Sequence, residues 1–247
     1  MDINIMPLTG RHILVTRPEP QGAHLCELLA KMGAYAYYIP TLEIRPCAIN
    51  LSLFQPDIAI FISANAVKYY PFNKFPKAVR YFAVGVATTI ALMQRGVIAQ
   101  QPEKSSSEGL LDLTELQQVN EKEVAIFCGV GGRTVLQETL KKRGARCQRY
   151  EVYQRYAAVN EAQRLQSLLK KIVLDYVICT SGENLLSLEQ LSGSQRTCLH
   201  QTPLVVISDR IAVLAKKQGF TQVLAMSESF DNIGIVQQLV KYSKEVT

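Results

Sequence analysis

The feature that most constrains the fold is an alternation of short apolar runs with amphipathic helical segments, which recurs along the 247-residue chain. The apolar run at 12–16 (HILVT) precedes a helical pattern over 21–33 that ends at Gly33, and a second apolar run follows at 34–40 (AYAYYIP). The same order of strand, helix and strand returns over residues 124–153. Strands that alternate with helices predict parallel sheets covered by helices on both faces.

Other segments also repeat, and they share their turn residues. DIAIFISANAV at 57–67 and DYVICTSGENL at 175–185 each carry an aspartate before an apolar run and a serine in the turn after it. A serine and an acidic residue open a helical pattern from Ser105 onward and again from Ser227 onward, as helix caps do. The two halves of the chain therefore share one order of elements.

The spacing of matched residues points to an internal duplication. Thr16 matches Cys128 and Gly33 matches Gly144, at separations of 128−16=112 and 144−33=111 residues. We predict a duplication from the agreement of the turn residues. A doubly wound α/β fold without duplication would produce the same order of elements, and it is the alternative.

Folds of this kind bind ligands beyond the carboxyl ends of their strands, where helix N-termini present unpaired N–H groups and a positive dipole end. Ser63, Thr88, Ser181 and Ser208 lie at or just past the predicted strand ends. Two sheets with small residues in these turns can present two sets of amide donors to one ligand held between them. The pattern therefore favours an anionic ligand.

The segment CGVGGR at 128–133 is close to a dinucleotide-binding fingerprint, but Thr134 stands where the third glycine is required. No P-loop motif occurs either. Nicotinamide binding is therefore disfavoured. A glycine turn remains, with Arg133 at the start of a helix, and this arrangement suits a carboxylate or a phosphate.

Two strand ends leave alternatives open. In VTRPE, Arg17 either pairs with Glu19 or contacts the ligand. In VYQR, Tyr153 either covers an edge of the core or faces a cleft as a phenolic acid. The pattern alone favours the first role for Tyr153.

Composition narrows the function further. Lys and Arg outnumber Asp and Glu by 27 to 21, and the net charge of +6 favours an anionic partner, but the basic residues are dispersed and no nucleic-acid recognition motif occurs. The 6 cysteines and 3 histidines lack the spacing of a metal site, so we expect no metal. No apolar run reaches the ~18 residues of a membrane span, and the N-terminus lacks signal-peptide features. We expect a cytoplasmic protein that binds neither nucleic acid nor a membrane.

These motifs, in this order, resemble the uroporphyrinogen-III synthase family, and the likeness spans nearly the whole chain. The second half departs from the family pattern at Ser208–Ala212 and at Glu228–Phe230. The matching segments are Thr16-Arg17-Pro18, the P-x-x-x-I of Pro40 to Ile44, FISANAV, AVGVATT at 83–89, SSEGLL at 106–111, GGR to RGA across 131–145, and VYQR at 152–155.

The resemblance implies an α/β protein with two similar flavodoxin-like parallel-sheet lobes joined by two extended connectors. The chain would cross between lobes near Pro40–Glu43 and near Tyr153–Ala157, with the substrate in the cleft. Residues 1–40 plus 156–247 would form a discontinuous first lobe, and residues 41–155 the second. The pattern alone leaves open two tandem domains that meet near 120–123.

The resemblance also implies an activity. The family closes hydroxymethylbilane, a linear tetrapyrrole with eight carboxylates, into uroporphyrinogen III, with loss of water and inversion of the last pyrrole, in haem biosynthesis. It implies a hydro-lyase without a cofactor, a monomer, and transient handover of substrate from the preceding enzyme. A two-lobed binding or sensor protein without turnover, and a flavin- or nucleotide-binding protein, are the alternatives.

The family match assigns roles to individual residues. Tyr153 would be the general acid that assists loss of the hydroxyl. The residues expected to bind substrate are Arg17, Ser63, Ala64, Asn65, Thr88, Gly131, Arg133, Thr180, Ser181, Ser208 and Arg210.

Overall fold

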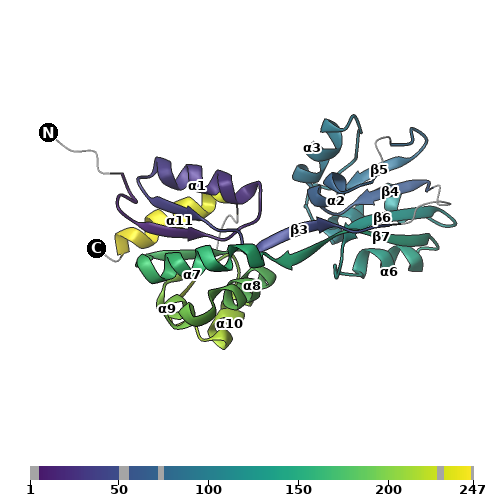
Figure 1. Ribbon diagram of the computed structural model, residues 1–247. Coiled ribbons are helices and arrows are strands. Elements are labelled where there is room, and N and C mark those ends of the chain that lie inside the picture. Colours follow the sequence, from purple (N-terminus) through teal and green to yellow (C-terminus); the bar gives the residue numbers. More distant parts are fainter. Residues whose placement is uncertain (1–5, 50–55, 72–74, 227–230, 246–247) are drawn as a thin grey trace. The chain divides into compact units, whose positions relative to one another are not determined.

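The chain consists of two α/β units (Figure 1). Unit 1 contains Met1–Glu43 and Tyr156–Thr247, and unit 2 contains Ile44–Arg155. The computed structural model describes residues 6–49, 56–71, 75–226 and 231–245.

Unit 1 is built on a five-stranded sheet with the order β10-β9-β8-β1-β2. Each neighbouring pair in this sheet is parallel. Numbered within the unit, the order is 2-1-3-4-5, as in flavodoxin-like folds. The strands are β1 (His12–Val15), β2 (Tyr35–Tyr38), β8 (Tyr176–Cys179), β9 (Leu204–Val206) and β10 (Val223–Ala225).

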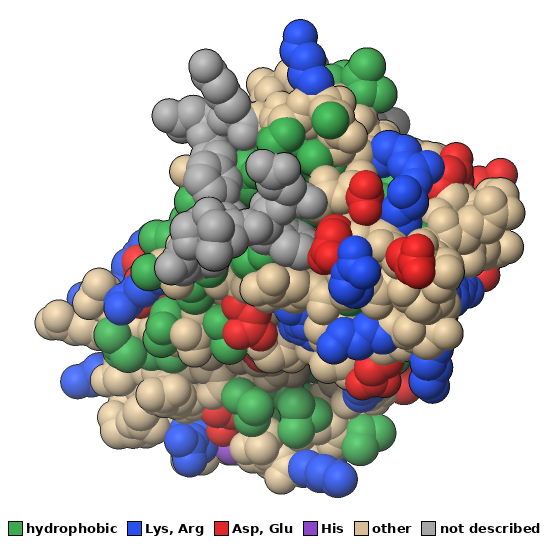
Figure 2. Space-filling view, turned by 90° about the vertical axis from the view of Figure 1, so that its right-hand side faces the viewer, with side chains coloured by type: hydrophobic (Ala, Val, Ile, Leu, Met, Phe, Trp, Pro, Cys, Tyr) green, Lys and Arg blue, Asp and Glu red, His purple; other side chains and the backbone are tan. Residues whose placement is uncertain are grey.

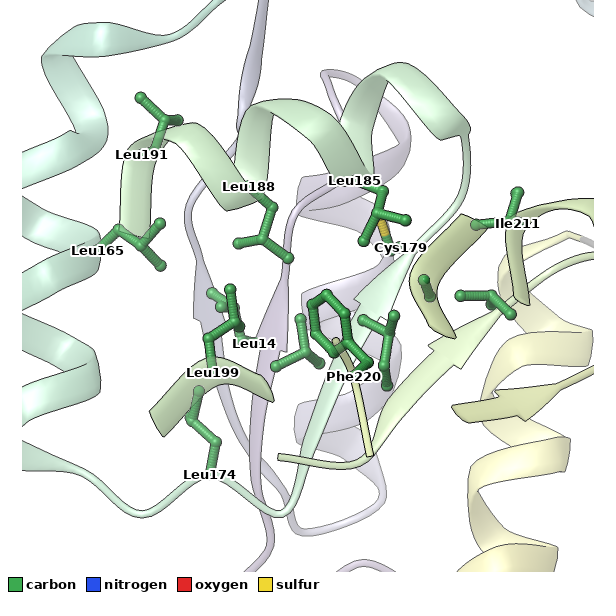
Figure 3. Close-up of a cluster of buried hydrophobic side chains, with 14 of the residues drawn as sticks. Leu14, Leu165, Leu174, Cys179, Leu185, Leu188, Leu191, Leu199, Ile211 and Phe220 are labelled. Carbon is green, nitrogen blue, oxygen red and sulfur yellow. The ribbon is translucent and has the colours of Figure 1, made fainter. Parts of the chain in front are cut away.

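Helices cover both faces of this sheet because side chains alternate along each strand. On β1, Leu14 packs into one cluster, whereas Ile13 and Val15 pack into the other. Figure 3 shows the first cluster, in which Leu14 lies under α8 and near Phe220. The helices on the face of this first cluster are α7 (Ala162–Lys171), α8 (Gly182–Ser192), α9 (Arg196–Gln201) and α10 (Asp209–Gln218), with the short helices η1 (Val159–Glu161) and η2 (Gly193–Gln195) beside them. The opposite face is covered by α1 (Gln21–Lys31) and α11 (Asn232–Glu245).

Unit 2 has a sheet with the order β3-β7-β6-β4-β5, in which β7, β6, β4 and β5 pair in parallel. Strand β3 lies at the outer edge of β7. Ala158 donates its N–H to the Thr41 carbonyl (2.9 Å) and Cys47 donates to the Val152 carbonyl (3.0 Å), so this pair runs antiparallel. The strands are β3 (Leu42–Pro46), β4 (Ile58–Phe61), β5 (Arg80–Ala83), β6 (Glu123–Gly129) and β7 (Arg146–Ala157).

The helices of unit 2 also divide between the two faces. On β4, Ile58 and Ile60 pack on one face, and Ala59 and Phe61 on the other. The first face carries α4 (Ser107–Asp112), α5 (Thr114–Gln117) and α6 (Val135–Lys142), and the second carries α2 (Ala64–Lys68) and α3 (Val86–Gln94).

The repeated aspartate pins the start of a neighbouring strand in both units. Asp175 Oδ2 accepts the His12 N–H at 2.8 Å, and Asp57 Oδ2 accepts the Glu123 N–H at 2.9 Å. Each carboxylate therefore satisfies an N–H at the entrance of a central strand, β1 or β6, and sets the register of the adjacent strand. The matched aspartates thus hold equivalent places in the two sheets.

These bonds correct the predicted alignment of the two halves. The two bonded residues, His12 and Glu123, are 111 residues apart (123−12=111), and their strand partners Tyr35 and Arg146 have the same separation (146−35=111). Thr16 is therefore matched with Phe127, and the prediction that matched it with Cys128 is wrong by one residue. Gly33 and Gly144 keep the separation of 111, and both follow a helix with positive φ, +90° and +85°.

The helix caps follow the prediction where the structure describes them. Ser106 Oγ accepts the Gly109 N–H at 2.9 Å and caps α4. The predicted cap at Ser227 and the segment Glu228–Phe230 lie outside the described residues. At the start of α11, Asp231 Oδ1 accepts the Gly234 N–H at 2.8 Å.

One buried asparagine joins three segments of unit 1. Asn184 is 0 % exposed, and its Nδ2 donates to the Thr16 carbonyl (2.9 Å) and to Thr41 Oγ1 (2.5 Å). Its Oδ1 accepts the Thr180 N–H at 3.2 Å. The equivalent residue of unit 2 is the buried Ala66 (184−118=66), which has no polar side chain.

Asn184→Ala should therefore lower the free energy of unfolding by about 3 kcal/mol, because it removes the buried amide and its hydrogen bonds to the Thr16 carbonyl, Thr41 Oγ1 and the Thr180 N–H. Urea denaturation measures the change. Leu186→Ala, on the exposed side of the same helix, is the matched control and should have a much smaller effect. Equal midpoints for Asn184→Ala and the unchanged protein would contradict this account.

Candidate active site

In each unit, parallel strands bring their carboxyl ends to one edge of the sheet. In unit 1, β1 and β8 are neighbours, and the helices that follow them, α1 and α8, pack on opposite faces. In unit 2, β4 and β6 are neighbours, and α2 and α6 also pack on opposite faces. Open α/β sheets bind ligands where successive connections diverge in this way. We name these edges the unit 1 rim, formed by Arg17, Thr180, Ser181 and Ser208, and the unit 2 rim, formed by Ser63, Gly131, Arg133 and Tyr153.

Ser63 opens the unit 2 rim as the cap of α2. Its backbone is extended (φ −167°), and its Oγ accepts the Ala66 N–H at 3.0 Å. Ala64 and Asn65 are the first two residues of α2, so their N–H groups belong to the helix end that has no partner within the helix. The predicted set Ser63, Ala64 and Asn65 therefore lies together at one strand end.

Tyr153 lies at the same edge, on β7 opposite Gly129 of β6. Its Oη accepts hydrogen bonds from Ser63 Oγ (3.1 Å) and from Arg155 Nη2 (3.2 Å). The ring packs so tightly on Gly129 that a Cβ there would lie 2.6 Å from Tyr153 Cζ. The side chain is only 2 % exposed, as expected of a residue that covers the core, yet its hydroxyl joins two polar side chains at the strand end. The burial of the ring agrees with a role in covering the core, and the role of Tyr153 as an acid stays a prediction.

The glycine turn follows β6. Gly131 has φ +76°, a conformation that favours glycine. Arg149 of β7 holds the turn, because its Nη1 donates to the carbonyls of Gly132 (3.2 Å) and Arg133 (3.1 Å). The Arg133 guanidinium is exposed and pairs with Glu108 in the first turn of α4. A backbone N–H and Arg133 lower the pKa of Glu108.

Thr88 lies elsewhere. Its side chain is 3 % exposed, inside unit 2, and its N–H donates to the Gly85 carbonyl at 3.0 Å. Thr88 lies just past the end of β5, as predicted, in the first turn of α3. The structure turns it toward the core instead of the rim.

The unit 1 rim is organised by Ser181, which caps α8. Ser181 Oγ accepts the Asn184 N–H at 3.1 Å, and the Thr180 N–H is held by the Asn184 side chain. Ser208 precedes α10 with an extended backbone (φ −165°), but its side chain makes no cap hydrogen bond. Arg210 is exposed in the first turn of the same helix.

Arg17 bonds to Asn232 and not to Glu19, which was one of the two predicted alternatives. Its Nη1 donates to Asn232 Oδ1 at 2.5 Å, at the start of α11. Burial lowers the pKa of Arg17, and the Asp231 carboxylate opposes that change. Arg17 thus connects the unit 1 rim, at the end of β1, to the start of α11.

Two arginines of this region, Arg149 and Arg155, were missed. The signal for Arg155 was its position two residues after Tyr153 on a strand, since such residues share a face. No local signal marks Arg149, because its contacts with the glycine turn join separate elements. The surface in Figure 2 otherwise interleaves basic and acidic side chains, in agreement with the dispersed charges of the sequence.

The pockets of the two units lie away from most rim residues. One, of about 570 Å³, runs along α7 and includes Tyr37, Arg164 and Lys171, but none of the predicted binding residues. Another, of about 640 Å³, adjoins the glycine turn and includes Val130 and Arg149. The rims remain the better candidates, because helix starts and turn amides converge there.

Metal and thiol chemistry find no support in the described part of the chain. No group of three or more His, Cys, Asp or Glu side chains there could hold a metal ion. Burial raises the pKa of Cys128, and it raises the pKa of Cys179 to about 12, so both thiols stay protonated. Among the same residues, no helix is long and apolar enough to cross a membrane.

Comparison with known proteins identifies the family. The family model described as uroporphyrinogen-III synthase HemD matches residues 23–237. The chain belongs to the uroporphyrinogen-III synthase family. Uroporphyrinogen-III synthases of Escherichia coli K12 and of Salmonella typhimurium LT2 are each 33 % identical to it, and each match covers 92 % of this chain and 99 % of the relative.

Solved structures share the fold. Uroporphyrinogen-III synthetase from Helicobacter pylori 26695 aligns with a TM-score of 0.65 at 14 % identity, and covers 94 % of this chain and 99 % of that one. A mutant uroporphyrinogen III synthase from Thermus thermophilus aligns with a TM-score of 0.57 at 13 % identity, and covers 96 % and 100 %. The predicted α/β class with two parallel-sheet units is confirmed.

The contact between Gly129 and Tyr153 can be tested directly. Gly129→Ala should displace the phenol ring and lower the free energy of unfolding by about 1–3 kcal/mol, because the added Cβ overlaps Tyr153. Gly132→Ala is the control, since its Cβ would lie 3.4 Å from the nearest atom, Arg149 Nη2. Urea midpoints and near-ultraviolet circular dichroism report the difference, and equal values for the two variants would refute the packing account.

Proposed function

We propose that this chain is a cofactor-independent hydro-lyase of tetrapyrrole biosynthesis that converts hydroxymethylbilane into uroporphyrinogen III. The observation that carries the proposal is the family match over residues 23–237, supported by 33 % identity along 99 % of the Escherichia coli enzyme. The reaction expels water, closes the ring and inverts the terminal pyrrole. The parallel sheets and their rims are compatible with this chemistry.

The charge of the substrate suits what the rims offer. Hydroxymethylbilane carries eight carboxylates, and helix starts after β4 and β8 present N–H groups with the positive end of a helix dipole. Arg133 and Arg210 add exposed guanidinium groups. Backbone donors therefore supply much of the binding, and a few arginines supplement them.

Most of the catalysis is positioning. Loss of the hydroxyl produces an azafulvene cation, and in free solution the terminal pyrrole attacks it through its nearest position and closes without inversion. The enzyme holds the chain so that attack occurs at the substituted carbon, which gives a spiro intermediate that fragments and recloses. Correct orientation of reacting groups supplies ~7–11 kcal/mol of such a barrier.

Tyr153 is the proposed general acid for loss of the hydroxyl. A positioned proton donor contributes ~10²–10⁴-fold to a rate, either directly or through one water. The Tyr153 hydroxyl lies at the carboxyl edge of the unit 2 sheet, beside Ser63. The buried ring limits movement of the hydroxyl, which favours a fixed donor.

The instability of the substrate bears on how the enzyme receives it. Because hydroxymethylbilane closes on its own, we propose transient handover from the enzyme that makes it. We also propose that the protein acts as a monomer in the cytoplasm.

The first test of function is product identity. Hydroxymethylbilane generated in a coupled assay should yield mainly isomer III with this protein, and isomer I without it. Chromatography of the oxidised porphyrins separates the two isomers. A binding or sensor protein would leave isomer I as the product, and that result would overturn the proposal.

Arg133 tests the anionic recognition. Arg133→Gln should raise KM about 3- to 10-fold with little change in kcat, because a charged donor to substrate carboxylates is lost. Arg146→Gln is the matched control: its side chain is 65 % exposed, against 67 % for Arg133, but it starts β7 at the opposite end of the sheet. The difference in KM should shrink at high salt. Equal KM values in both variants would remove Arg133 from the binding site.

A further inference from the structure

The Tyr153 hydroxyl is surrounded by donors. A guanidinium carries donors and no acceptor atom, so the hydrogen bond between Arg155 Nη2 and Tyr153 Oη (3.2 Å) must run toward the phenol. Ser63 Oγ accepts the Ala66 N–H (3.0 Å) and donates its own proton to Tyr153 Oη (3.1 Å). Because both neighbours donate to the Tyr153 oxygen, the phenolic proton forms a hydrogen bond with neither of them.

Arg155 also holds the ring. Its Cζ lies 5.3 Å from the centroid of the Tyr153 ring, within the range of a cation–π contact. Gly129 and Tyr69 pack against other parts of the same ring, and the Tyr69 centroid lies 6.2 Å away. The ring is 2 % exposed whereas Arg155 is exposed, so Arg155 is the solvent-side neighbour of a phenol that is otherwise enclosed.

We propose that Arg155 is a positioning residue for Tyr153: its guanidinium directs the phenolic proton away from the protein and stabilises the phenolate that remains after proton transfer. This inference rests on the proposed function, and it gives a role to a residue of the VYQR segment to which the family resemblance assigned none. Ser63 has the supporting role, since it supplies the second donor from the cap of α2.

Proton transfer begins and ends at the Tyr153 oxygen. The O–H bond of Tyr153 breaks, and its proton passes to the hydroxyl oxygen of the substrate. The C–O bond breaks with its electron pair on that oxygen, which leaves as water, and the substrate becomes the azafulvene cation. Final ring closure releases a proton from a pyrrole carbon, and this proton returns to the phenolate. Ser63 Oγ and Arg155 Nη2 both donate to this oxygen, so neither hydrogen bond has to break when the proton leaves.

A double-mutant cycle tests the coupling. Arg155→Met should lower kcat about 10- to 100-fold with little change in KM, because a charged hydrogen bond to the developing phenolate is lost. Arg155→Lys should recover part of that loss. In the Tyr153→Phe background the same Arg155→Met change should alter kcat by no more than about twofold. Arg146→Met, on the same strand, should leave kcat unchanged in both backgrounds.

A second measurement needs no substrate. In protein labelled with 3-fluorotyrosine, the fluorine resonance that disappears in Tyr153→Phe belongs to Tyr153. That resonance should shift in Arg155→Met and stay in place in Arg146→Met.

Failure of the proposed function and failure of the positioning role give different results. Failure to form isomer III overturns the proposed function, and the fluorine resonance then decides the contact with Arg155. If Arg155→Met lowers kcat equally in the unchanged protein and in the Tyr153→Phe background, Arg155 acts independently of the phenol and the inference is wrong. An unshifted resonance, or unchanged kcat in Arg155→Met, would also overturn the positioning role.

Discussion

Parallel pairing of the central strands is the constraint on which both rims depend. A parallel sheet places every strand's carboxyl end at one edge, and each following helix must start there with unpaired N–H groups. The register of that edge is held at the opposite end of the strands, where Asp57 and Asp175 accept the N–H groups of Glu123 and His12. A slip of one residue would move every side chain of the strand to the opposite face of the sheet, and would move the caps away from the strand ends.

The two units fill equivalent interior positions in opposite ways. In unit 1, Thr16 and Asn184 form a hydrogen-bonded cluster at the ends of β1 and β8. Cys179, at the end of β8, also contacts Asn184. In unit 2 the residue matched to Thr16 is Phe127 (16+111=127) and the residue matched to Cys179 is Phe61 (179−118=61). The rings of Phe127 and Phe61 stack with their centroids 4.7 Å apart. A buried polar cluster requires every partner to be in place, whereas an aromatic stack depends on shape. The two halves therefore share the order of four parallel strands but not one kind of core.

Sequence reasoning recovered what repeats locally. The alternation of elements, the glycine stops such as Gly33, and the serine cap in the segment from Ser105 onward follow from periodicity and helix-end chemistry, and the structure has them. The alignment error at Thr16 arose because neighbouring apolar residues look alike, whereas the aspartate bonds that set the register join strands far apart in the chain. For the same reason the contact of Ser63 with Tyr153, which are distant in sequence, has no local signal. The prediction gave Thr88 its correct place just past a strand end, but that place does not say which way the side chain points.

The rims contain two kinds of functional group, backbone amide donors and the side-chain hydroxyl of Tyr153. Amide donors at the starts of α2 and α8 belong to the backbone, so substitution of side chains leaves them in place as long as the caps and strand registers survive. The Tyr153 hydroxyl depends instead on residues from β6, β7 and the α2 cap, since Gly129 leaves room for the ring and Ser63 and Arg155 donate to the oxygen. Binding can therefore tolerate sequence change that proton transfer cannot. A site of this kind should lose affinity gradually as surface charges change, but lose turnover sharply when the surroundings of one hydroxyl are altered.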